Sequence, residues 1–324
     1  MSDRSDWLEW RQQGLGGSDL SAILGLSPYR DATPLAVWLS KVEPLQDDED
    51  TSRPWLASGQ RLEAAVCDWY LDEVATPPVG HELRMVEGEP TVGPEPWMRG
   101  TPDRIVRVHP IAEPVSVDGW GLEAKTDRNH RSWDQAVPLH VQVQCQWYLL
   151  ITGLDRWDVA VYLKGRDDWR SYSLDADEQV QTHLYRTARQ WWDRHVVGHE
   201  APDLDGSDTA KQWLLRRYPE PRGVHREATA DELELVLRYR ELRLRHEDLG
   251  RARAALEAEL KEAIGDAAGL AGDWGQITWG RVSGRRTIDG RRLRRELPEV
   301  AEAFNTTSAP SRRLTVAWAE GERR

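Results

Sequence analysis

The stretch Gly121-Leu122-Glu123-Ala124-Lys125 decides the predicted fold and site. It has the pattern of a strand, in which residues two apart point to the same face, so Glu123 and Lys125 share one side of a sheet. Asp103 ends another predicted strand within residues 97–108, and Glu63 lies in a predicted helix over residues 54–74. Magnesium in proteins takes one or two carboxylates plus waters and substrate phosphate. The order of these segments therefore predicts metal-assisted hydrolysis of a phosphodiester.

The hydrophobic patterns predict a mixed sheet flanked by helices, an α/β class of fold. Predicted strands cover residues 81–86, 97–108, 119–126, 157–164 and 169–174, and the main predicted helices cover 54–74, 138–151 and 175–197. Residues 198–228 are rich in Pro, Gly, Asp and Arg, which is typical of a linker. We therefore expect a core over 1–197, a linker over 198–228, and a long helix with a small arginine-rich region over 229–324.

A leucine recurs every seven residues in the predicted helix over 229–264. These leucines are Leu235, Leu242, Leu249 and Leu256, and the intervening position holds Tyr239 and Leu260. Such a repeat is typical of a coiled-coil seam. His246 and Arg253 interrupt the intervening position. We therefore favour a helix packed on its own chain over an independent parallel coiled coil.

Composition narrows the class of protein. The chain has 324 residues and 39% hydrophobic residues, enough for a core without covalent staples. Cys67 and Cys145 are its only cysteines, which excludes a disulfide framework and a cysteine metal cluster. Residues 1–11 lack the apolar core of a signal peptide, and no stretch approaches the roughly 20 apolar residues of a membrane span. The sequence predicts a cytosolic protein without a membrane partner.

The net charge of −12 is unevenly distributed. Seven arginines and one acid, Asp289, lie between Arg281 and Arg295, so this segment carries +6, seven minus one. Because counterion release depends on the charges that touch phosphate, an acidic protein can bind DNA through a locally basic surface. The segment is either a DNA-tracking surface or an ordinary solvated face. The 17 tryptophans sit mostly at apolar helical positions, which favours core packing over base stacking.

Several stretches together carry a resemblance to a known family. They are Arg11-Gln12-Gln13-Gly14-Leu15-Gly16-Gly17-Ser18-Asp19, Ile23-Leu24-Gly25-Leu26-Ser27-Pro28-Tyr29, Gly59-Gln60-Arg61-Leu62-Glu63, Thr101-Pro102-Asp103, Gly121 to Lys125, Val143-Gln144-Cys145-Gln146 and Ile151-Thr152-Gly153. In these stretches the chain resembles the YqaJ-type viral recombinases, relatives of phage lambda exonuclease within the PD-(D/E)xK nuclease superfamily. The resemblance covers about residues 7–195, and it implies a restriction-endonuclease-like core with a C-terminal helical extension.

The resemblance implies a metal site. Asp103, Glu123 and the backbone carbonyl of Ala124 would bind a catalytic Mg²⁺ or Mn²⁺, and Glu63 would hold a second ion or its water. Lys125 would orient or deprotonate the attacking water. Desolvation and a nearby cation favour this role because both lower the pKa of an ammonium. One or two ions are thus expected as the cofactor, and metal and lysine together would generate the nucleophile.

The resemblance also implies a site for a 5′-phosphate. In the family an arginine and a serine seven residues apart bind this group, and Arg11 and Ser18 reproduce the spacing. Ser18 also begins a predicted helix, where backbone amides favour anions. Thr101 replaces a serine at a further contact, and Arg131 matches a further phosphate-binding arginine. Gln144 would position the water or the scissile phosphate.

These expectations together predict a phage-encoded, metal-dependent exonuclease. It would resect double-stranded DNA ends from 5′ to 3′ and leave single strands for a phage annealing protein. An endonuclease of the same fold and a catalytically silent DNA-binding subunit are the alternatives. A Cas4-like protein is disfavoured because the four cluster cysteines are missing. Relatives close into toroidal trimers, and the tail after residue 197 leaves a homo-trimer open for this chain.

Overall fold

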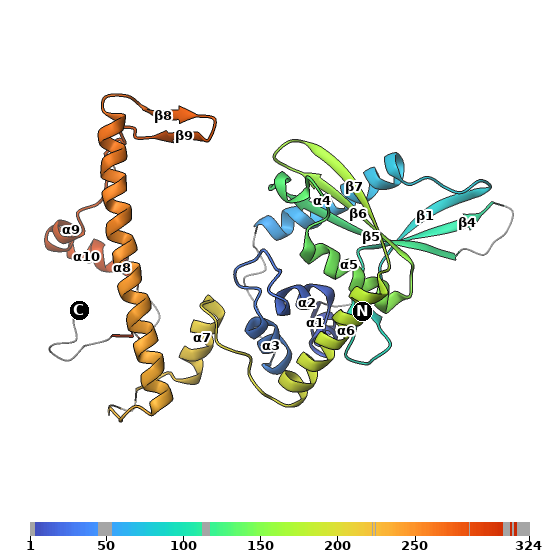
Figure 1. Ribbon diagram of the computed structural model, residues 1–324, viewed down its shortest axis with the longest axis horizontal. Helices are drawn as coiled ribbons and strands as arrows, with labels where there is room; N and C mark the ends of the chain where they lie inside the picture. The colour runs from blue at the N-terminus through green and yellow to red at the C-terminus, as the bar shows by residue number, and fades with distance from the viewer. Residues whose placement is uncertain are drawn as a thin grey trace. The chain divides into compact units, whose positions relative to one another are not determined.

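The computed structural model divides the chain into two compact units, Met1–Arg217 and Tyr218–Arg324 (Figure 1). The division lies within the predicted linker. The structure describes residues 4–44, 54–111, 117–221, 223, 225–284, 286–306, 312, 314 and 315, with residues 54–57, 60, 117 and 118 described by their backbone alone.

A mixed sheet of five strands forms the centre of the N-terminal unit. In spatial order the strands are β1 (His81–Glu87), β4 (Arg104–Pro110), β5 (Val117–Asp127), β6 (Arg156–Leu163) and β7 (Asp168–Asp175). β5 and β6 pair in parallel, and the other neighbours pair antiparallel. A parallel pair needs a crossover connection, and helix α5 (Leu139–Thr152) supplies it. The predicted strands over residues 157–164 and 169–174 are confirmed as β6 and β7.

Helices cover both faces of this sheet (Figure 1). Besides α5, the helices of this unit are α1 (Arg4–Gln12), α2 (Gly17–Ile23), α3 (Pro34–Val42), α4 (Pro54–Trp69) continued by the π-helix η1 (Tyr70–Val74), the short η2 (His130–Trp133), α6 (Glu178–Trp191) continued by η3 (Trp192–Val197), and α7 (Asp208–Arg217). Helix α7 packs on α3, where Trp213 contacts Trp38. Strand β6 shows the alternation: Val159 and Val161 join the core formed with α2, α3, α5 and α6, while Ala160 joins the core formed with α4. The predicted mixed sheet flanked by helices is confirmed.

The predicted strand over residues 97–108 is wrong in one respect. The segment forms two strands: β3 (Arg99–Gly100) pairs with β2 (Thr91–Val92) in a separate two-stranded sheet, and β4 begins only at Arg104. Pro102 has no N–H to donate to a ladder, which breaks the pairing between them. Asp103 therefore lies in the bend between two sheets, where its side chain is free to turn toward β5.

Tryptophans at apolar helical positions pack in the cores, as predicted. Trp38, Trp147 and Trp191 are buried, and Trp69 and Trp192 are partly buried against the cores. Both cysteines are free and buried. Among the helices of the described chain, none is long and apolar enough to cross a membrane.

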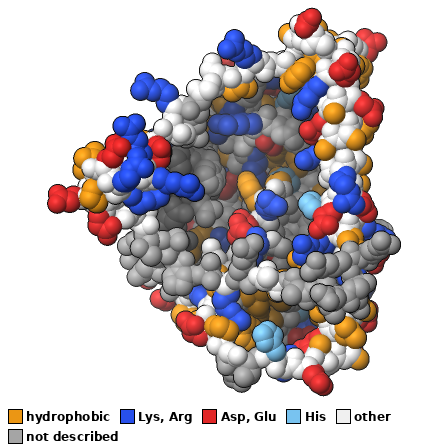
Figure 2. Space-filling model, turned by 90° about the vertical axis from the view of Figure 1, so that its left-hand side faces the viewer, with side chains coloured by type: hydrophobic (Ala, Val, Ile, Leu, Met, Phe, Trp, Pro, Cys, Tyr) orange, Lys and Arg blue, Asp and Glu red, His pale blue; other side chains and the backbone are white. Residues whose placement is uncertain are grey.

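The C-terminal unit contains the predicted long helix, α8 (Ala230–Ile264), and its beginning is capped by Thr229 and Glu232. The Thr229 side chain accepts a hydrogen bond from the Glu232 amide (3.3 Å), and the Glu232 carboxylate accepts one from the Thr229 amide (2.9 Å). A hairpin and two short helices follow: β8 (Gly269–Gly272), β9 (Gly275–Thr278), α9 (Gly290–Glu296) and α10 (Pro298–Ala303). Of the arginine-rich segment, Arg285 lies outside the described residues. Basic, acidic and hydrophobic side chains intermingle on the face drawn in Figure 2.

Gly121 is the point where β5 and β6 leave no room for a side chain. A Cβ built there would lie 2.3 Å from ring carbons of Trp157, which is fully buried. We predict that Gly121→Ala lowers the free energy of unfolding by roughly 1–3 kcal/mol, the usual cost of overpacking a core. Gly59→Ala is the control, because that Cβ would meet nothing within 4 Å and lies in a helix. It should raise the free energy of unfolding by up to about 1 kcal/mol. Equal effects in denaturant titrations would contradict this packing.

Candidate active site

Strand β5 and helix α5 bring Glu123, Lys125 and Gln144 into one hydrogen-bonded group. The Lys125 ammonium donates to Glu123 Oε1 in a short ion pair and to Gln144 Oε1 at 3.2 Å. Gln144 Nε2 in turn donates to the same Glu123 Oε1 at 2.8 Å. The Glu123 side chain is 1% exposed, whereas that of Lys125 is 28% exposed. Glu123 and Lys125 therefore share a face, as their spacing predicts, and the lysine lies nearer to solvent.

Asp103 is attached to the same strand by the backbone. Its Oδ2 accepts a hydrogen bond from the Ala124 amide at 2.9 Å, so its carboxylate lies beside the residue that separates Glu123 from Lys125. Glu63, on α4, accepts from Arg104 Nη1 at 3.0 Å, and the same nitrogen donates to the Asp103 backbone carbonyl at 2.6 Å. Arg104 thus links the helical glutamate to the bend that carries Asp103.

Burial and mutual repulsion disfavour the charged forms of all three carboxyl groups. Burial raises the pKa of Glu123 to about 7, with Asp103 and Glu63 adding to the shift and Lys125 opposing it. Burial also raises the pKa of Asp103, against Lys125, the Ala124 amide and Arg104. For Glu63, burial and Asp103 raise the pKa, and Arg104 and Lys125 oppose this shift. Three acids here face two cationic side chains, so a further cation would be stabilised among them.

The prediction that the pKa of Lys125 is lowered is wrong when only the protein's own side chains surround it, without a metal cation. Burial acts to lower the pKa of Lys125, but the carboxylates of Glu123 and Asp103 outweigh burial and raise it. The ammonium form is therefore favoured, since two acids lie beside it. Lys125 is a proton-bearing hydrogen-bond donor in this arrangement rather than a base.

The donor atoms fit a hard divalent cation. Within residues that the structure describes, no three His, Cys, Asp or Glu side chains already form a metal-binding group. Glu63 is instead paired with Arg104, and Glu123 with Lys125. Glu123 Oε2, however, is buried and has no hydrogen-bond partner. An orphaned buried carboxylate oxygen is costly unless a cation or donor meets it, and carboxylate oxygens are the ligands that Mg²⁺ and Mn²⁺ prefer.

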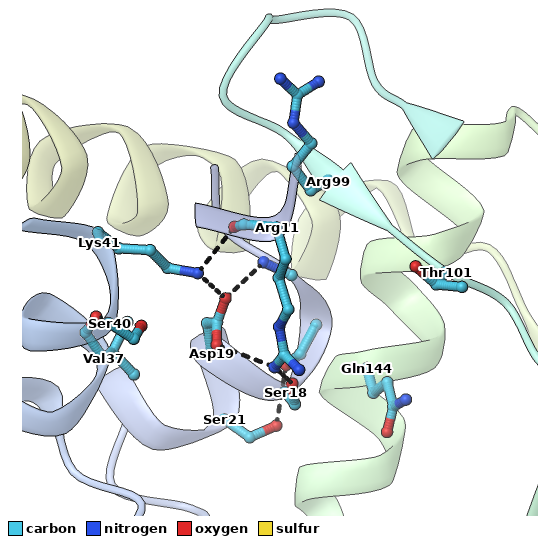
Figure 3. Close-up of polar contacts among 12 residues, drawn as sticks. Arg11, Ser18, Asp19, Ser21, Val37, Ser40, Lys41, Arg99, Thr101 and Gln144 are labelled. Atoms are coloured by element: carbon cyan, nitrogen blue, oxygen red, sulfur yellow. Dashed lines mark hydrogen bonds and ion pairs between the residues drawn. The ribbon is translucent and has the colours of Figure 1, made fainter. Parts of the chain in front are cut away.

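A second feature adjoins these carboxylates: a cavity of about 210 Å³ lined by Arg11, Ser18, Thr101 and Gln144, among others. Arg11 Nη2 donates to Ser18 Oγ at 3.0 Å, and the guanidinium lies 5.3 Å from the centre of the Trp7 ring. Figure 3 shows the Arg11 side chain pointing to the beginning of α2, with Gln144 on the neighbouring helix. Gln144 both lines this cavity and hydrogen-bonds Glu123 and Lys125, so it connects the two features.

Two close contacts hold the cavity together. A Cβ on Gly17 would lie 2.8 Å from Gln144 Cα, so only glycine lets α2 approach α5 this closely. Tyr148 Oη accepts from Gln144 Nε2 at 3.1 Å and donates to the Thr101 carbonyl at 3.1 Å. Sequence reasoning did not single out Tyr148, although it stands one helical turn after Gln144 on the same face.

A buried ion-pair network lies behind Arg11 (Figure 3). Asp19 Oδ2 accepts from Lys41 Nζ and from the Gly16 amide, both at 2.9 Å, and Oδ1 lies 3.4 Å from Arg11 Nη2. Lys41 Nζ also donates to the Arg11 carbonyl at 3.2 Å. Sequence reasoning quoted Asp19 only as part of a motif and missed the role of Lys41. The available signal was that Lys41 is one of five lysines in an arginine-rich chain and lies at a buried helix position.

Burial and neighbouring charges shift the pKa values of Asp19 and Lys41 for different reasons. Burial alone would raise the pKa of Asp19, but Lys41, Arg11 and the Gly16 amide lower it to about 2. Burial lowers the pKa of Lys41, the Asp19 carboxylate opposes this shift, and the Arg11 guanidinium adds to it. The Asp19 anion is thus the fixed charge that holds both cations.

Two other arginines, Arg131 and Arg99, do not group with the Arg11 side chain. Arg131 is exposed on η2 and lines a different cavity with residues 132, 134–139 and 142, so the structure does not place it beside Arg11. Arg99 also lines the Arg11 cavity, but Figure 3 shows its side chain directed away from Arg11. Its guanidinium lies 5.1 Å from the centre of the Trp10 ring and donates to Gln13 at 3.3 Å.

Comparison with known proteins agrees with this arrangement of motifs. Residues 6–155 match the family model of the YqaJ-like viral recombinase domain. The match confirms the resemblance that the motifs predicted. The uncharacterized protein YqaJ of Bacillus subtilis (strain 168) is 27% identical over 305 residues, which cover 92% of this chain and 90% of the relative.

Two solved structures resemble part of this chain. The alkaline exonuclease LHK-Exo from Laribacter hongkongensis, in complex with dAMP, aligns with a TM-score of 0.46 and 14% identity, covering 66% of this chain and 97% of that chain. A phage related exonuclease from Haemophilus somnus 129PT aligns with a TM-score of 0.36 and 11% identity, covering 58% of this chain and 96% of that chain.

Removing the Asp19 carboxylate should weaken the fold in a pH-dependent way. We predict that Asp19→Asn lowers the free energy of unfolding at neutral pH by roughly 3–5 kcal/mol, because Lys41 stays buried without its partner. In the unchanged protein this contribution is present above the ordinary Asp pKa of 3.8 and is lost as the pH falls through the folded pKa of about 2. The difference in the free energy of unfolding between the unchanged protein and Asp19→Asn should therefore become smaller as the pH falls over that range.

Denaturant titrations followed by tryptophan fluorescence at several pH values measure this difference. Asp193→Asn is the matched control, because Asp193 is 52% exposed and pairs only with Arg189 within its helix. It should change the free energy of unfolding by about 0.5 kcal/mol or less. If the difference in the free energy of unfolding between the unchanged protein and Asp19→Asn stayed constant as the pH fell through the folded pKa of Asp19, the pairing of Asp19 with Lys41 would be contradicted.

Proposed function

We propose that this chain is a metal-dependent exonuclease that removes nucleotides from the 5′ strand of double-stranded DNA ends. The observation that carries the proposal is the double role of Gln144, which lines the Arg11 cavity and hydrogen-bonds the Glu123–Lys125 pair. A terminal phosphate in the cavity would lie next to the carboxylates, so the following phosphodiester bond would be the one cleaved. The family match of residues 6–155 and the exonuclease titles of the structural relatives agree with a nuclease.

The carboxylates of Asp103 and Glu123 would hold the first ion, together with the backbone carbonyl of Ala124. Glu63 would hold a second ion or its water once Arg104 gives way. When bound, Mg²⁺ or Mn²⁺ would supply a water of lowered pKa and stabilise negative charge on the phosphate. Glu123 Oε2, buried and without a donor, supports this assignment.

The chain's own side chains would orient the reacting groups. Lys125 carries its proton beside Glu123 and would donate a hydrogen bond to the attacking water or the phosphate, where positive charge favours the transition state. Gln144 would fix the direction of that ammonium through its 3.2 Å contact. Arg11 and Ser18 would bind the terminal phosphate, since a guanidinium matches phosphate oxygens with paired donors. Thr101, which also lines the cavity, would add a hydroxyl contact.

The proposed reaction also defines partners and place of action. Resection from the 5′ end leaves a 3′-ended single strand, which a phage annealing protein would pair with a complementary strand in the host cytosol. A homo-trimer would keep the enzyme on its product strand, and this assembly remains part of the proposal. An endonuclease would cut closed circles, and a silent DNA-binding subunit would release no nucleotides, so the substrate tests below separate these alternatives.

Loss of the Lys125 ammonium should abolish most of the activity. We predict that Lys125→Met lowers Mg²⁺-dependent release of nucleotides from linear duplex DNA by roughly 10²–10³-fold, the usual effect of removing one hydrogen-bond donor that stabilises charge in the transition state. Lys211→Met is the control, because Lys211 is 65% exposed and pairs with Asp208 on its own helix α7. It should keep the activity of the unchanged protein. Equal activity of the two variants, or digestion of closed circular DNA, would contradict the proposal.

The Arg11 cavity should give the enzyme its preference for phosphorylated ends. We predict that the unchanged protein degrades 5′-phosphate duplexes faster than 5′-hydroxyl duplexes, and that Arg11→Gln lowers this ratio by roughly tenfold, since one charge-assisted hydrogen bond contributes about 1.5–3 kcal/mol. Arg84→Gln is the control, because Arg84 is 63% exposed and pairs with Glu82 on the edge strand. If Arg11→Gln left the ratio of the two degradation rates unchanged, the Arg11 cavity would not be the site that recognises the 5′-phosphate.

A further inference from the structure

Helix α8 carries a hydrophobic stripe that the described residues of its own unit, Tyr218–Arg324, leave uncovered. The stripe contains four leucines at seven-residue spacing, and each is more than half exposed: Leu235 61%, Leu242 64%, Leu249 70% and Leu256 59%. Tyr239 (44%) and Leu260 (39%) extend it on the same side. A second group, Leu233, Leu237 and Leu244, lies on the opposite side and ends halfway along the helix. The heptad stripe is the one that spans α8.

The order of side chains along this stripe discriminates between two ways of pairing it with another copy. The eight positions are Leu235, Tyr239, Leu242, His246, Leu249, Arg253, Leu256 and Leu260. In a parallel pair each residue faces its own counterpart, so Arg253 meets Arg253 and His246 meets His246 in the seam. Two guanidinium groups in contact within an apolar seam repel each other and lose water.

An antiparallel pair removes that conflict. If Leu235 faces Leu260 of a second copy, then Tyr239 faces Leu256, Leu242 faces Arg253 and His246 faces Leu249 on that copy. Every layer then contains at least one leucine, and no like charges meet. Arg253, whose side chain is 81% exposed and 3.3 Å from Glu257 of its own helix, can direct its head group to solvent beside a leucine.

The charged residues that flank the stripe agree with the same arrangement. Arg238, Arg243 and Arg245 flank its first half, and Glu257 and Glu259 flank its second half. Antiparallel pairing places Arg238 opposite Glu259 of the second copy at both ends of the seam. Parallel pairing would place Arg238 beside Arg243 instead. Arg243 pairs with Glu247 along its own helix at 3.2 Å, which leaves the stripe itself free.

We propose that α8 pairs antiparallel with α8 of a second copy of this chain, through the stripe from Leu235 to Leu260. The occupant is a second copy because the stripe is complementary to itself when reversed, both in its apolar layers and in its flanking charges. Such an isologous contact needs no other partner to close. The surface lies outside the residues assigned to the carboxylates and to the Arg11 cavity, so it adds an assembly contact to the proposed nuclease.

Single-cysteine cross-linking of the full chain tests this register. The two native cysteines are buried and free, so they supply a low background. Leu235→Cys and a size-tagged Leu260→Cys are co-expressed and treated with mild oxidant. An antiparallel pair brings these two positions within the roughly 7 Å that a disulfide spans, while two copies of position 235 stay about 37 Å apart, 25 residues at 1.5 Å each. The mixed disulfide should exceed either self-linked product by at least about tenfold.

Each other outcome overturns the proposal. A Leu235→Cys chain that links mainly to itself shows a parallel pair, and the absence of any cross-link shows that α8 packs on its own chain or on a different protein. Charge reversal gives an independent check that keeps the apolar stripe intact. Arg238→Glu should lower the yield of the mixed disulfide, and adding Glu259→Arg on the same chain should restore it. Failure of the double variant to recover the yield would contradict the antiparallel register.

Discussion

The burial of the Glu123 carboxylate is the constraint on which the rest of this site depends. The side chain is 1% exposed, and an anion in such a place is stable only when cations or donors meet it. Lys125 and Gln144 both use one of its oxygens, and the other has no donor. Asp103 and Glu63 add two more acids nearby. The sheet thus assembles more negative charge than Arg104 and Lys125 balance, which is the electrostatic condition for binding a divalent cation.

Much of this arrangement could be predicted from local pattern. Strand periodicity places Glu123 and Lys125 on one face, and the structure confirms this. The helix with Gln144 and the mixed sheet are also as expected, because their apolar periods are long and regular. The short segment around Pro102 was harder, since a run of β-type residues does not reveal that it belongs to two different sheets. The placement of Asp103 follows from that tertiary switch.

Contacts between distant segments explain what sequence reasoning missed. Arg104 acts on Glu63 across 41 residues, and Lys41 reaches Asp19 and the Arg11 carbonyl across 22 and 30 residues. No local period encodes such pairs, because a basic residue on a strand or a helix is normally expected to be exposed. The same reason accounts for the pKa of Lys125, which is set by which acids surround it. Burial favours the neutral amine, and the neighbouring carboxylates reverse that preference.

The central claim, that the Asp103 and Glu123 carboxylates bind a divalent cation beside the Arg11 cavity, is most directly tested by crystallography with Mn²⁺. Crystals of the full chain soaked in Mn²⁺ would be measured at a wavelength where manganese scatters anomalously. The account predicts an anomalous peak bonded to Asp103 and to Glu123 Oε2. A crystal without that peak, in which Glu123 keeps only its contacts with Lys125 and Gln144, would contradict it.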